Sequence, residues 1–269
     1  MAQQSISPSP RTVTEDRHGA VAVLTIDRPH VRNALDGATL HALFEHLTVL
    51  GADPSVRAIV LTATGDKAFS AGLDLKALAT DGLPELATRP VNLLRDGRFG
   101  TPVIAAVNGA AIGGGFELVL ACDLRVAAEH AVFALPEVSR GIAASEGGTD
   151  LPLQLPLAVA LEIGLAGEPL TAQRALQLGL VNRVLPAEQV LPAAVELAER
   201  IAGHSPAAVA ATKELMYRSL TDGVDERRAA NRAATERLLA GPDAAEGAAA
   251  FVEKRQPRWA DPVVASSIC

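Results

Sequence analysis

The sequence predicts an α/β fold, because two kinds of pattern alternate along its 269 residues. Short runs rich in Val, Ile and Ala are followed by stretches whose apolar residues recur at helical spacing, an order typical of a sheet with covering helices. After Pro186 the β-like runs stop and only helical patterns follow. Hydrophobic residues make up 49 % of the chain and aromatic residues 3 %, so the core is expected to consist mainly of Ala, Val and Leu.

Each predicted element rests on one of these patterns. Strands are expected at Ala20–Asp27, Val56–Thr64, Pro102–Gly109, Asp123–Glu129, Ala131–Leu135 and Leu178–Pro186. Gly37–Asp53 is predicted to be a helix, because Leu40, Leu43 and Leu47 fall on one stripe. Further helices are expected at Phe116–Cys122, Val190–Ala202, Pro206–Leu220, Val224–Ala240 and Ala244–Arg255. Thr80–Arg98 has weak periodicity and several Pro and Gly residues, and we predict a loop or a mobile helix over a site.

The domain organisation follows from composition. Residues 1–14, with their Ser, Pro and Gln, are expected to form a disordered tail, and they contain no apolar segment typical of a secretory signal. Residues 15–200 are expected to form the core, and residues 201–269 a helical region that packs on the core or reaches another subunit. The two cysteines, Cys122 and Cys269, make neither a disulfide framework nor a zinc site, so a reducing, cytoplasmic location is expected.

Charge and hydropathy exclude two classes of partner. The formal net charge of −7 argues against a non-specific nucleic-acid binder, which needs a basic face. Val103–Asp123 is apolar enough to raise the question of a membrane span, but three consecutive glycines, Asn108 and Glu117 argue against one. We therefore expect neither a nucleic-acid nor a membrane partner.

Two glycine-containing turns are candidates for a binding site. Gly113–Gly115 lies between a predicted strand and a predicted helix, where backbone N–H groups are free to face a ligand. It is neither a P-loop nor a dinucleotide fingerprint, because no Gly-Lys-Ser/Thr follows and the residue three after Gly115 is Leu118. The second turn contains Ala71 and Gly72, and two N–H groups from separate segments are what an oxyanion hole requires. The alternatives are close packing of strand against helix and a plain turn before a helix.

Two carboxylates are candidates for acid/base chemistry. Glu117 lies in an apolar helix, where an unpaired charge is costly, and burial moves a carboxyl pKa toward neutrality. Glu137 follows Pro136, so the pair is equally typical of an ordinary helix start. The six histidines are scattered and no Gly-x-Ser-x-Gly motif is present, so no nucleophile arrangement competes.

Six motifs together resemble those of the crotonase superfamily, and within it the enoyl-CoA hydratases. They are RPHVRNAL (Arg28–Leu35), AFSAGLDLKAL (Ala68–Leu78), PVIAAVNGAAIGGGFELVLACD (Pro102–Asp123), FALPEVSRG (Phe133–Gly141), GLVNRVLP (Gly179–Pro186) and AFVEKR (Ala250–Arg255). They occur in the family's order, from about Glu15 to Trp259. The resemblance implies a spiral of ββα units and a helical C-terminal region that builds a trimer, or a hexamer made of two trimers.

The resemblance also implies roles for residues of the site. The oxyanion hole matches the N–H groups of Ala71 and Gly114, while Glu117 activates water and Glu137 serves the α-carbon. Contacts to the acyl-CoA substrate match Arg32, Ala71, Gly72, Leu73, Asp74 and Gly114 and, across a subunit boundary, Phe251 and Lys254. No metal and no cofactor is expected, since coenzyme A belongs to the substrate.

One stretch departs from the family pattern and leaves the reaction open. Many hydratases have Pro-Gly-Ala-Gly-Gly where this chain has Ala144-Ser145-Glu146-Gly147-Gly148. Glu146 is expected to raise the pKa of its neighbours or to bind a polar acyl group. The same motifs also resemble carnitinyl-CoA dehydratases. Enoyl-CoA hydration is therefore expected, with a carnitinyl-CoA-type dehydratase, an isomerase, an acyl-CoA hydrolase or a CoA-binding protein without activity as alternatives.

Overall fold

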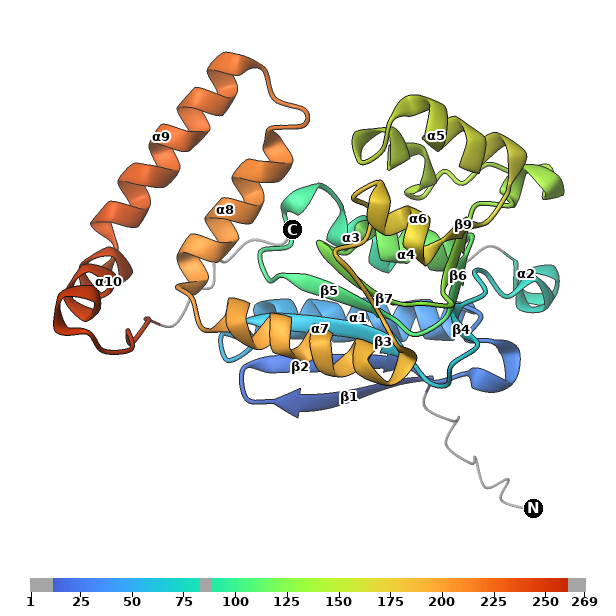
Figure 1. The fold of residues 1–269 in the computed structure, drawn as a ribbon, viewed down its shortest axis with the longest axis horizontal. Coiled ribbons are helices and arrows are strands. Elements are labelled where there is room, and N and C mark those ends of the chain that lie inside the picture. The colour runs from blue at the N-terminus through green and yellow to red at the C-terminus, as the bar shows by residue number, and fades with distance from the viewer. Residues whose placement is uncertain (1–11, 83–88, 261–269) are drawn as a thin grey trace, which may run out of the picture.

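The computed structural model describes residues 12–82 and 89–260, and the fold is shown in Figure 1. The chain begins with an antiparallel hairpin of β1 (Val13–His18) and β2 (Val21–Ile26), in which Val13 pairs with Ile26. The expected tail therefore ends earlier than residue 14, because Val13 is buried in this hairpin. The rest of the expected tail, residues 1–11, lies outside the described residues.

Two sheets form the centre of the molecule, and both contain mostly parallel pairs. Within the described residues, the larger has six strands in the order β1-β2-β3-β5-β7-β10, and the smaller has four in the order β4-β6-β8-β9. The further strands of the larger sheet are β3 (Ala58–Ala63), β5 (Val103–Val107), β7 (Leu124–Ala128) and β10 (Arg183–Leu185). The smaller sheet consists of β4 (Ala68–Ser70), β6 (Ala110–Ile112), β8 (Val132–Ala134) and β9 (Leu170–Thr171). Each central strand of the larger sheet is thus followed by a short strand of the smaller one, which is a spiral of repeating units.

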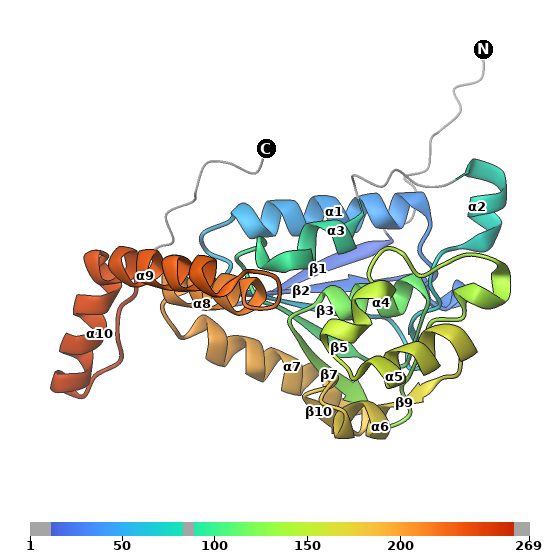
Figure 2. The ribbon, with the colours of Figure 1, turned by 90° about the horizontal axis from the view of Figure 1, so that it is seen from above.

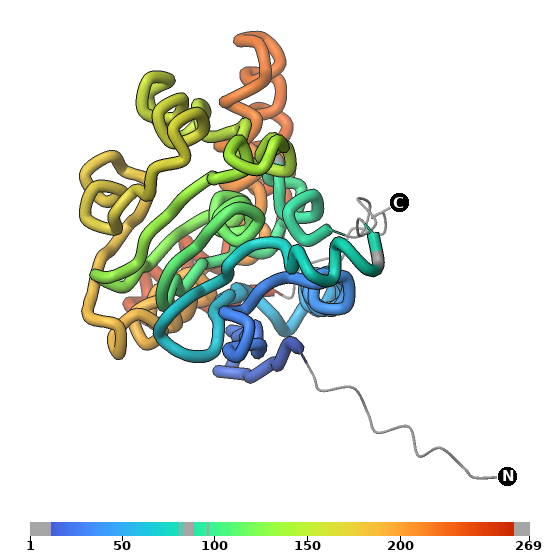
Figure 3. Tube along the Cα trace, turned by 90° about the vertical axis from the view of Figure 1, so that its right-hand side faces the viewer, coloured from blue at the N-terminus to red at the C-terminus, as the bar shows by residue number. Residues whose placement is uncertain are grey.

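Helices cover this spiral and connect its turns. The longer ones around the core are α1 (Gly37–Ala52), α4 (Gly114–Ala121) and α7 (Ala187–Ala202). Short helices are α2 (Leu75–Asp81), α3 (Pro90–Leu94), α5 (Leu157–Leu161) and α6 (Ala172–Gln177), together with the 3-10 turns η1 (Pro29–Val31), η3 (Arg95–Gly97), η4 (Glu137–Arg140) and η5 (Gly148–Leu153) and the π-helical turn η6 (Glu162–Ala166). In the side view of Figure 3, residues 141–178 (yellow-green to yellow) lie across the core from the N-terminal strands (blue).

The C-terminal helices α8 (Pro206–Arg218), α9 (Val224–Ala240) and α10 (Pro242–Glu253) form an arm that extends away from the sheets (Figures 1 and 2). Its base is fixed to the core by Asp123, whose carboxylate accepts hydrogen bonds from Lys213 Nζ (2.7 Å) and the Tyr217 hydroxyl (2.9 Å). Farther out the arm exposes large apolar side chains, with Leu239 71 % and Phe251 86 % exposed.

The predicted fold class is confirmed, including the helical C-terminal region. The short strands β1, β4, β6 and β9 were not predicted. Thr80–Arg98, predicted as a loop or a mobile helix, contains the end of α2, all of α3 and η3, and residues 83–88 lie outside the described part. In the described ranges no helix combines the length and the apolar character that a membrane crossing demands.

Candidate active site

The smaller sheet brings three loops to one edge. Its parallel strands β4, β6 and β8 pair through Ser70 with Ala111 and through Ile112 with Ala134. Parallel strands end at the same edge of a sheet, so the segments that follow these strands lie next to one another. The predicted loops at Ala71–Asp74, Gly113–Glu117 and Pro136–Glu137 therefore meet at this edge.

Gly113 makes the sharp turn from β6 into helix α4. Its φ of +55° and ψ of −128° suit glycine and few other residues. The Gly113 N–H donates to the Ala134 carbonyl, and its own carbonyl accepts from Phe116 and Glu117. The next N–H, that of Gly114, has no partner within the described residues, as the first turn of a helix dictates. The positive end of α4 thus presents a free donor.

Gly72 lets the loop after β4 approach this turn closely. Its φ is +86°, and a Cβ there would lie 2.6 Å from the Ile112 carbonyl oxygen and 3.2 Å from the Gly114 nitrogen. The following nitrogen, that of Leu73, lies 3.7 Å from the position that a Cβ on Gly114 would occupy. In the described part of the chain the Leu73 N–H has no hydrogen-bond partner either. Two free donors from separate segments, Leu73 and Gly114, are therefore side by side.

The assignment of the Ala71 N–H to the oxyanion hole is wrong in this structure. That N–H donates to the Arg32 carbonyl at 3.0 Å, and the Gly72 N–H donates to Ser70 Oγ at 3.1 Å. The loop predicted from the sequence does contain an N–H without a described partner, but that N–H belongs to Leu73 rather than to Ala71. Leu73 was expected only as a substrate contact, and the positive φ of Gly72 is what turns its N–H toward Gly114.

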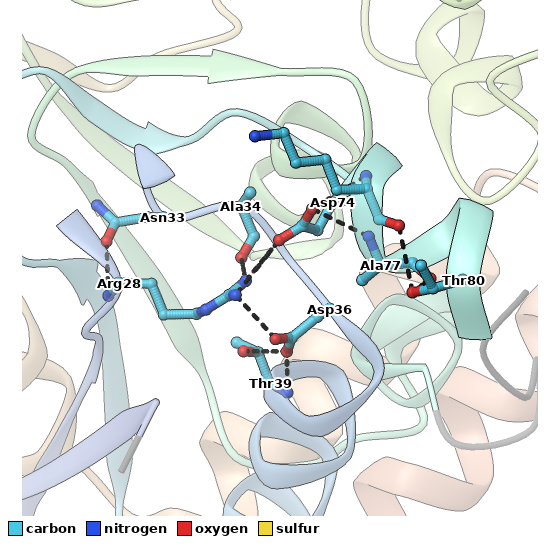
Figure 4. A network of polar contacts seen from close by, with 9 residues as sticks. Arg28, Asn33, Ala34, Asp36, Thr39, Asp74, Ala77 and Thr80 are labelled. Atoms are coloured by element: carbon cyan, nitrogen blue, oxygen red, sulfur yellow. Dashed lines mark hydrogen bonds and ion pairs between the residues drawn. The ribbon is translucent and has the colours of Figure 1, made fainter. Parts of the chain in front are cut away.

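A partly buried ion network holds the loop that carries Leu73 (Figure 4). The Arg28 guanidinium contacts Asp36 at 2.9 Å and Asp74 at 3.3 Å and donates to the Ala34 carbonyl. Asp74 also caps helix α2 by accepting from the N–H groups of residues 76 and 77. Burial opposes ionisation of Asp74, but these N–H groups and Arg28 hold the pKa of its carboxyl below the ordinary value. The Asp74 carboxylate, predicted as a substrate contact, is thus engaged within the protein.

Glu117 lies one turn into α4 and is 5 % exposed. Its Oε1 accepts three backbone hydrogen bonds, each 3.0 Å long, from the N–H groups of Glu146, Gly147 and Gly148. Burial nevertheless raises the pKa of Glu117, and the charge of Glu137 raises it further. The three donors fix one oxygen and leave Oε2 toward Gly114, 4.0 Å from the position of a Cβ on that glycine.

Glu137 is the first residue of η4, so the helix-start interpretation of Pro136-Glu137 also holds. Its Oε1 lies 2.8 Å from where a Cβ on Gly113 would be. Its Oε2 is buried and has no hydrogen-bond partner among the residues that the structure describes. Burial raises the pKa of this carboxyl as well. Glu117 and Glu137 therefore flank the Gly113–Gly114 turn, each with one oxygen available.

The other predicted contacts fall into two groups. Arg32 has a left-handed φ of +55° and holds Ala71 through its backbone carbonyl, close to the site. Phe251 lies in α10 and Lys254 follows its last residue, and within one chain this helix lies far from α4, which carries Glu117 (Figures 1 and 2). One chain alone does not bring these two residues to the site.

The stretch that departs from the family pattern contains contacts that the sequence did not reveal. Glu146 supplies a backbone donor to Glu117, while its side chain pairs with Arg89 at 2.9 Å rather than facing solvent. Arg89 was not predicted, because nothing in the spacing links it to residue 146. Among the described residues, nothing in the structure explains Ser145. Within residues 12–82 and 89–260 no group of three or more His, Cys, Asp or Glu residues is arranged to hold a metal ion.

Comparison with known proteins identifies the family. The family model described as enoyl-CoA hydratase/isomerase matches residues 16–262. The chain belongs to this family, the crotonases. It is 41 % identical to a carnitinyl-CoA dehydratase of Salmonella arizonae over 251 residues, 90 % of this chain and 96 % of that protein. A carnitinyl-CoA dehydratase of Proteus mirabilis is 41 % identical over 250 residues, with 90 % and 95 % covered.

Solved crotonase structures have the same fold. The enoyl-CoA hydratase of Mycobacterium tuberculosis superposes with a TM-score of 0.84 at 38 % identity, covering 93 % of this chain and 99 % of that one. The enoyl-CoA hydratase of Bacillus anthracis gives 0.86 at 35 % identity, covering 94 % and 100 %. The resemblance drawn from the motifs is confirmed, and the chain is a crotonase-family enzyme of the hydratase/dehydratase type.

Proposed function

We propose that this crotonase catalyses the reversible addition of water to the double bond of a 2-enoyl-CoA thioester. The observation that carries the proposal is the juxtaposition of two N–H donors without a partner among the described residues, Leu73 and Gly114, with a buried and a partly buried glutamate, Glu117 and Glu137, whose pKa values are raised. Donors of this kind stabilise an enolate oxygen, and carboxyls with raised pKa values are suited to donating and accepting protons in catalysis.

The mechanism places the thioester carbonyl oxygen between the two donors. Negative charge develops on that oxygen when water adds to the β-carbon, and both N–H groups and the positive end of α4 stabilise it. By precedent each such donor contributes about 2.7–4 kcal/mol to lowering the barrier. A site preorganised by Gly72 and Gly113 needs no rearrangement at the moment of reaction.

The two carboxyls divide the proton transfers. Glu117, held through Oε1, orients a water molecule with Oε2 and accepts its proton as the water oxygen bonds to the β-carbon. Glu137, in its protonated form, delivers a proton from its free Oε2 to the α-carbon of the enolate. Dehydration follows the same steps in reverse. We propose that no metal or additional cofactor takes part, and that the protein works in the cytoplasm.

A second candidate is dehydration of a carnitinyl-CoA-type thioester. It is supported by the relatives named for that reaction at 41 % identity. The same two glutamates serve it, because eliminating water reverses hydration. The acyl group alone distinguishes the two candidates.

We further propose that the enzyme is a trimer or a hexamer and that the arm of one subunit completes the site of another. Phe251 is 86 % exposed at the end of the arm, as expected of a residue covered on assembly. A cavity of about 1520 Å³ separates the arm from the core, with Leu120, Ala210 and Leu238 among its walls. A monomer at micromolar concentration in light scattering would contradict this.

The test is turnover of crotonyl-CoA, followed by loss of the absorbance of the conjugated thioester, beside dehydration of carnitinyl-CoA. Glu117→Gln and Glu137→Gln keep the shape of each side chain and remove its proton chemistry. Both are expected to lose at least two orders of magnitude in kcat. Wild type as slow as both variants on every thioester would exclude the proposal, whereas loss with Glu137→Gln alone would favour an isomerase.

A further inference from the structure

We propose that the ion pair between Arg89 and Glu146 positions the catalytic Glu117 by holding the loop of residues 146–148 against it. Arg89 and Glu146 are thus positioning residues for the site, and their effect on turnover rests on the proposed function. Their effect on the Glu117 carboxyl itself can be measured without any substrate.

The contacts show that one short segment holds the loop at two points. Arg89, directly before α3, reaches the Glu146 carboxylate at 2.9 Å, and the two side chains are 8 % and 19 % exposed. Arg95, directly after α3, donates to the Glu146 carbonyl at 3.3 Å and pairs with Asp150. A pair buried to this extent is weakly screened by salt, unlike a surface ion pair.

Tight packing transmits the position of the loop to Glu117. A Cβ on Gly147 would lie 3.4 Å from Val91 Cγ1 of α3 and 3.6 Å from Cβ of Glu117. A Cβ on Gly148 would lie 2.5 Å from Cβ of Ala144, so no side chain fits there. The loop is thus packed between α3 and α4, and its three N–H groups meet Glu117 Oε1 only while it stays in place.

The pair also neutralises a charge beside the catalytic carboxyl. Glu137 is the charged group that acts on Glu117 directly, while Glu146, Arg89 and the Arg95–Asp150 pair surround the loop that binds Glu117. The backbone N–H of Glu146 binds Glu117, so its side chain places a second negative charge near that carboxyl, and Arg89 compensates this charge. Three N–H donors favour ionised Glu117, whereas an uncompensated Glu146 would oppose ionisation.

Three variants separate the charge from the position. Arg89→Gln loosens the loop and leaves Glu146 uncompensated, so both effects raise the Glu117 pKa. Arg89→Gln/Glu146→Gln removes both charges and leaves only the loosening, which gives a smaller rise. Glu146→Gln leaves the positive charge of Arg89, which lowers the Glu117 pKa relative to the double variant.

The experiment titrates the Glu117 carboxyl by ¹³C NMR in substrate-free protein labelled at the glutamate carboxyls, with the signal assigned by its absence in Glu117→Gln. Arg89→Gln is expected to raise the pKa by about one unit, a tenfold change in ionisation. The expected order is Arg89→Gln highest, the double variant next, and Glu146→Gln lowest. The acid limb of the kcat/KM profile should move in the same order. Arg17→Gln, which breaks an exposed pair on β1, is the matched control and should equal wild type.

The outcomes distinguish this inference from the proposed function. A double variant whose Glu117 pKa equals that of wild type would overturn the positioning role, and equal Glu117 pKa values in Glu146→Gln and the double variant would overturn the charge effect. If Arg89→Gln does not fold, the difference in the Glu117 pKa between Glu146→Gln and the double variant still tests the charge effect. The difference in the Glu117 pKa between the double variant and wild type still tests the positioning role. Absence of turnover in wild type would refute the proposed function and leave the titration as a complete test of this inference.

Discussion

Replacing the Leu73 amide by an ester tests the oxyanion hole most directly. Incorporation of the α-hydroxy analogue of leucine deletes one N–H and keeps the side chain. In the structure this N–H binds no other described group, so its deletion should leave the fold largely intact and remove one of the two donors that we propose bind the enolate. The expected loss is about 10²–10³ in kcat, or about 2.7–4 kcal/mol, with little change in KM.

The ester at Ala71 is the matched control, because it removes the neighbouring N–H of the same loop. That N–H donates to the Arg32 carbonyl at 3.0 Å, so its deletion costs a structural hydrogen bond of about 1 kcal/mol. For a chain of this size the melting temperature should fall by about 2–4 °C while kcat changes little. The Leu73 ester also weakens the Gly72 carbonyl, which accepts from Leu35 at 2.8 Å, so a similar thermal shift is expected in both proteins.

The assay is stopped-flow turnover of whichever thioester the wild type hydrates, together with calorimetry of both esters. A kcat loss at Ala71 and none at Leu73 would refute the geometry and restore the donor predicted from the sequence. Equal losses would show that the loop acts as a unit, and no single N–H could then be assigned to the oxyanion.

Three further predictions concern residues around the same site. Glu117→Gln is expected to raise the melting temperature at pH 8, because the raised pKa means that ionised Glu117 destabilises the fold above its folded pKa. The difference in melting temperature between the variant and wild type should vanish below about pH 4.5, where Glu117 is protonated in both the folded and the unfolded state. An unchanged or lower melting temperature at pH 8 would contradict this reasoning. Gly113→Ala should lower the free energy of unfolding by about 1–3 kcal/mol and lower kcat, because Gly113 has a positive φ and a Cβ there would lie 2.8 Å from a Glu137 oxygen. Gly37 has open space around it, so Gly37→Ala should match wild type in denaturant titration and turnover. Arg28→Met leaves two partly buried carboxylates without their cation and should lower the unfolding free energy by about 1–3 kcal/mol. An unchanged denaturation midpoint would show that the network of Figure 4 does not hold the loop.

The long strands and helices could be predicted because their patterns are self-contained. β3 and β5 are continuous apolar runs buried on both faces, and the arm helices are separated by Gly and Pro. The strands β4 and β6 have three residues each, too short for any period to be detected. They were missed although they form the sheet that gathers the site.

The site could be predicted only in part, and the reason is geometric. Glu117 and Glu137 are predicted from their chemistry, but their separation of twenty residues in the sequence does not indicate the distance between them in space. The pairing of Ile112 with Ala134 is what places both glutamates at one edge. The choice of Leu73 over Ala71 depends on which N–H the chain itself consumes, and this is a property of backbone pairing, not of residue type.

Helix α4 shows why the chemistry needs the rest of the molecule. Eight residues form a helix that is marginal in isolation, yet its first turn holds both the N–H that we propose as an oxyanion donor and a carboxyl with a raised pKa. At its other end the buried Arg125 guanidinium donates to the carbonyls of Val119, Leu120 and Cys122 and of Leu180, so three carbonyls at the C-terminal end of the helix have a partner. The next residue, Asp123, fixes the base of the C-terminal arm. The hydrogen bonds of Arg125 hold the C-terminal end of α4, while its N-terminal end keeps the free N–H and the buried carboxyl. Through Asp123, this C-terminal end also connects the proposed active site to the arm on which we expect assembly to occur.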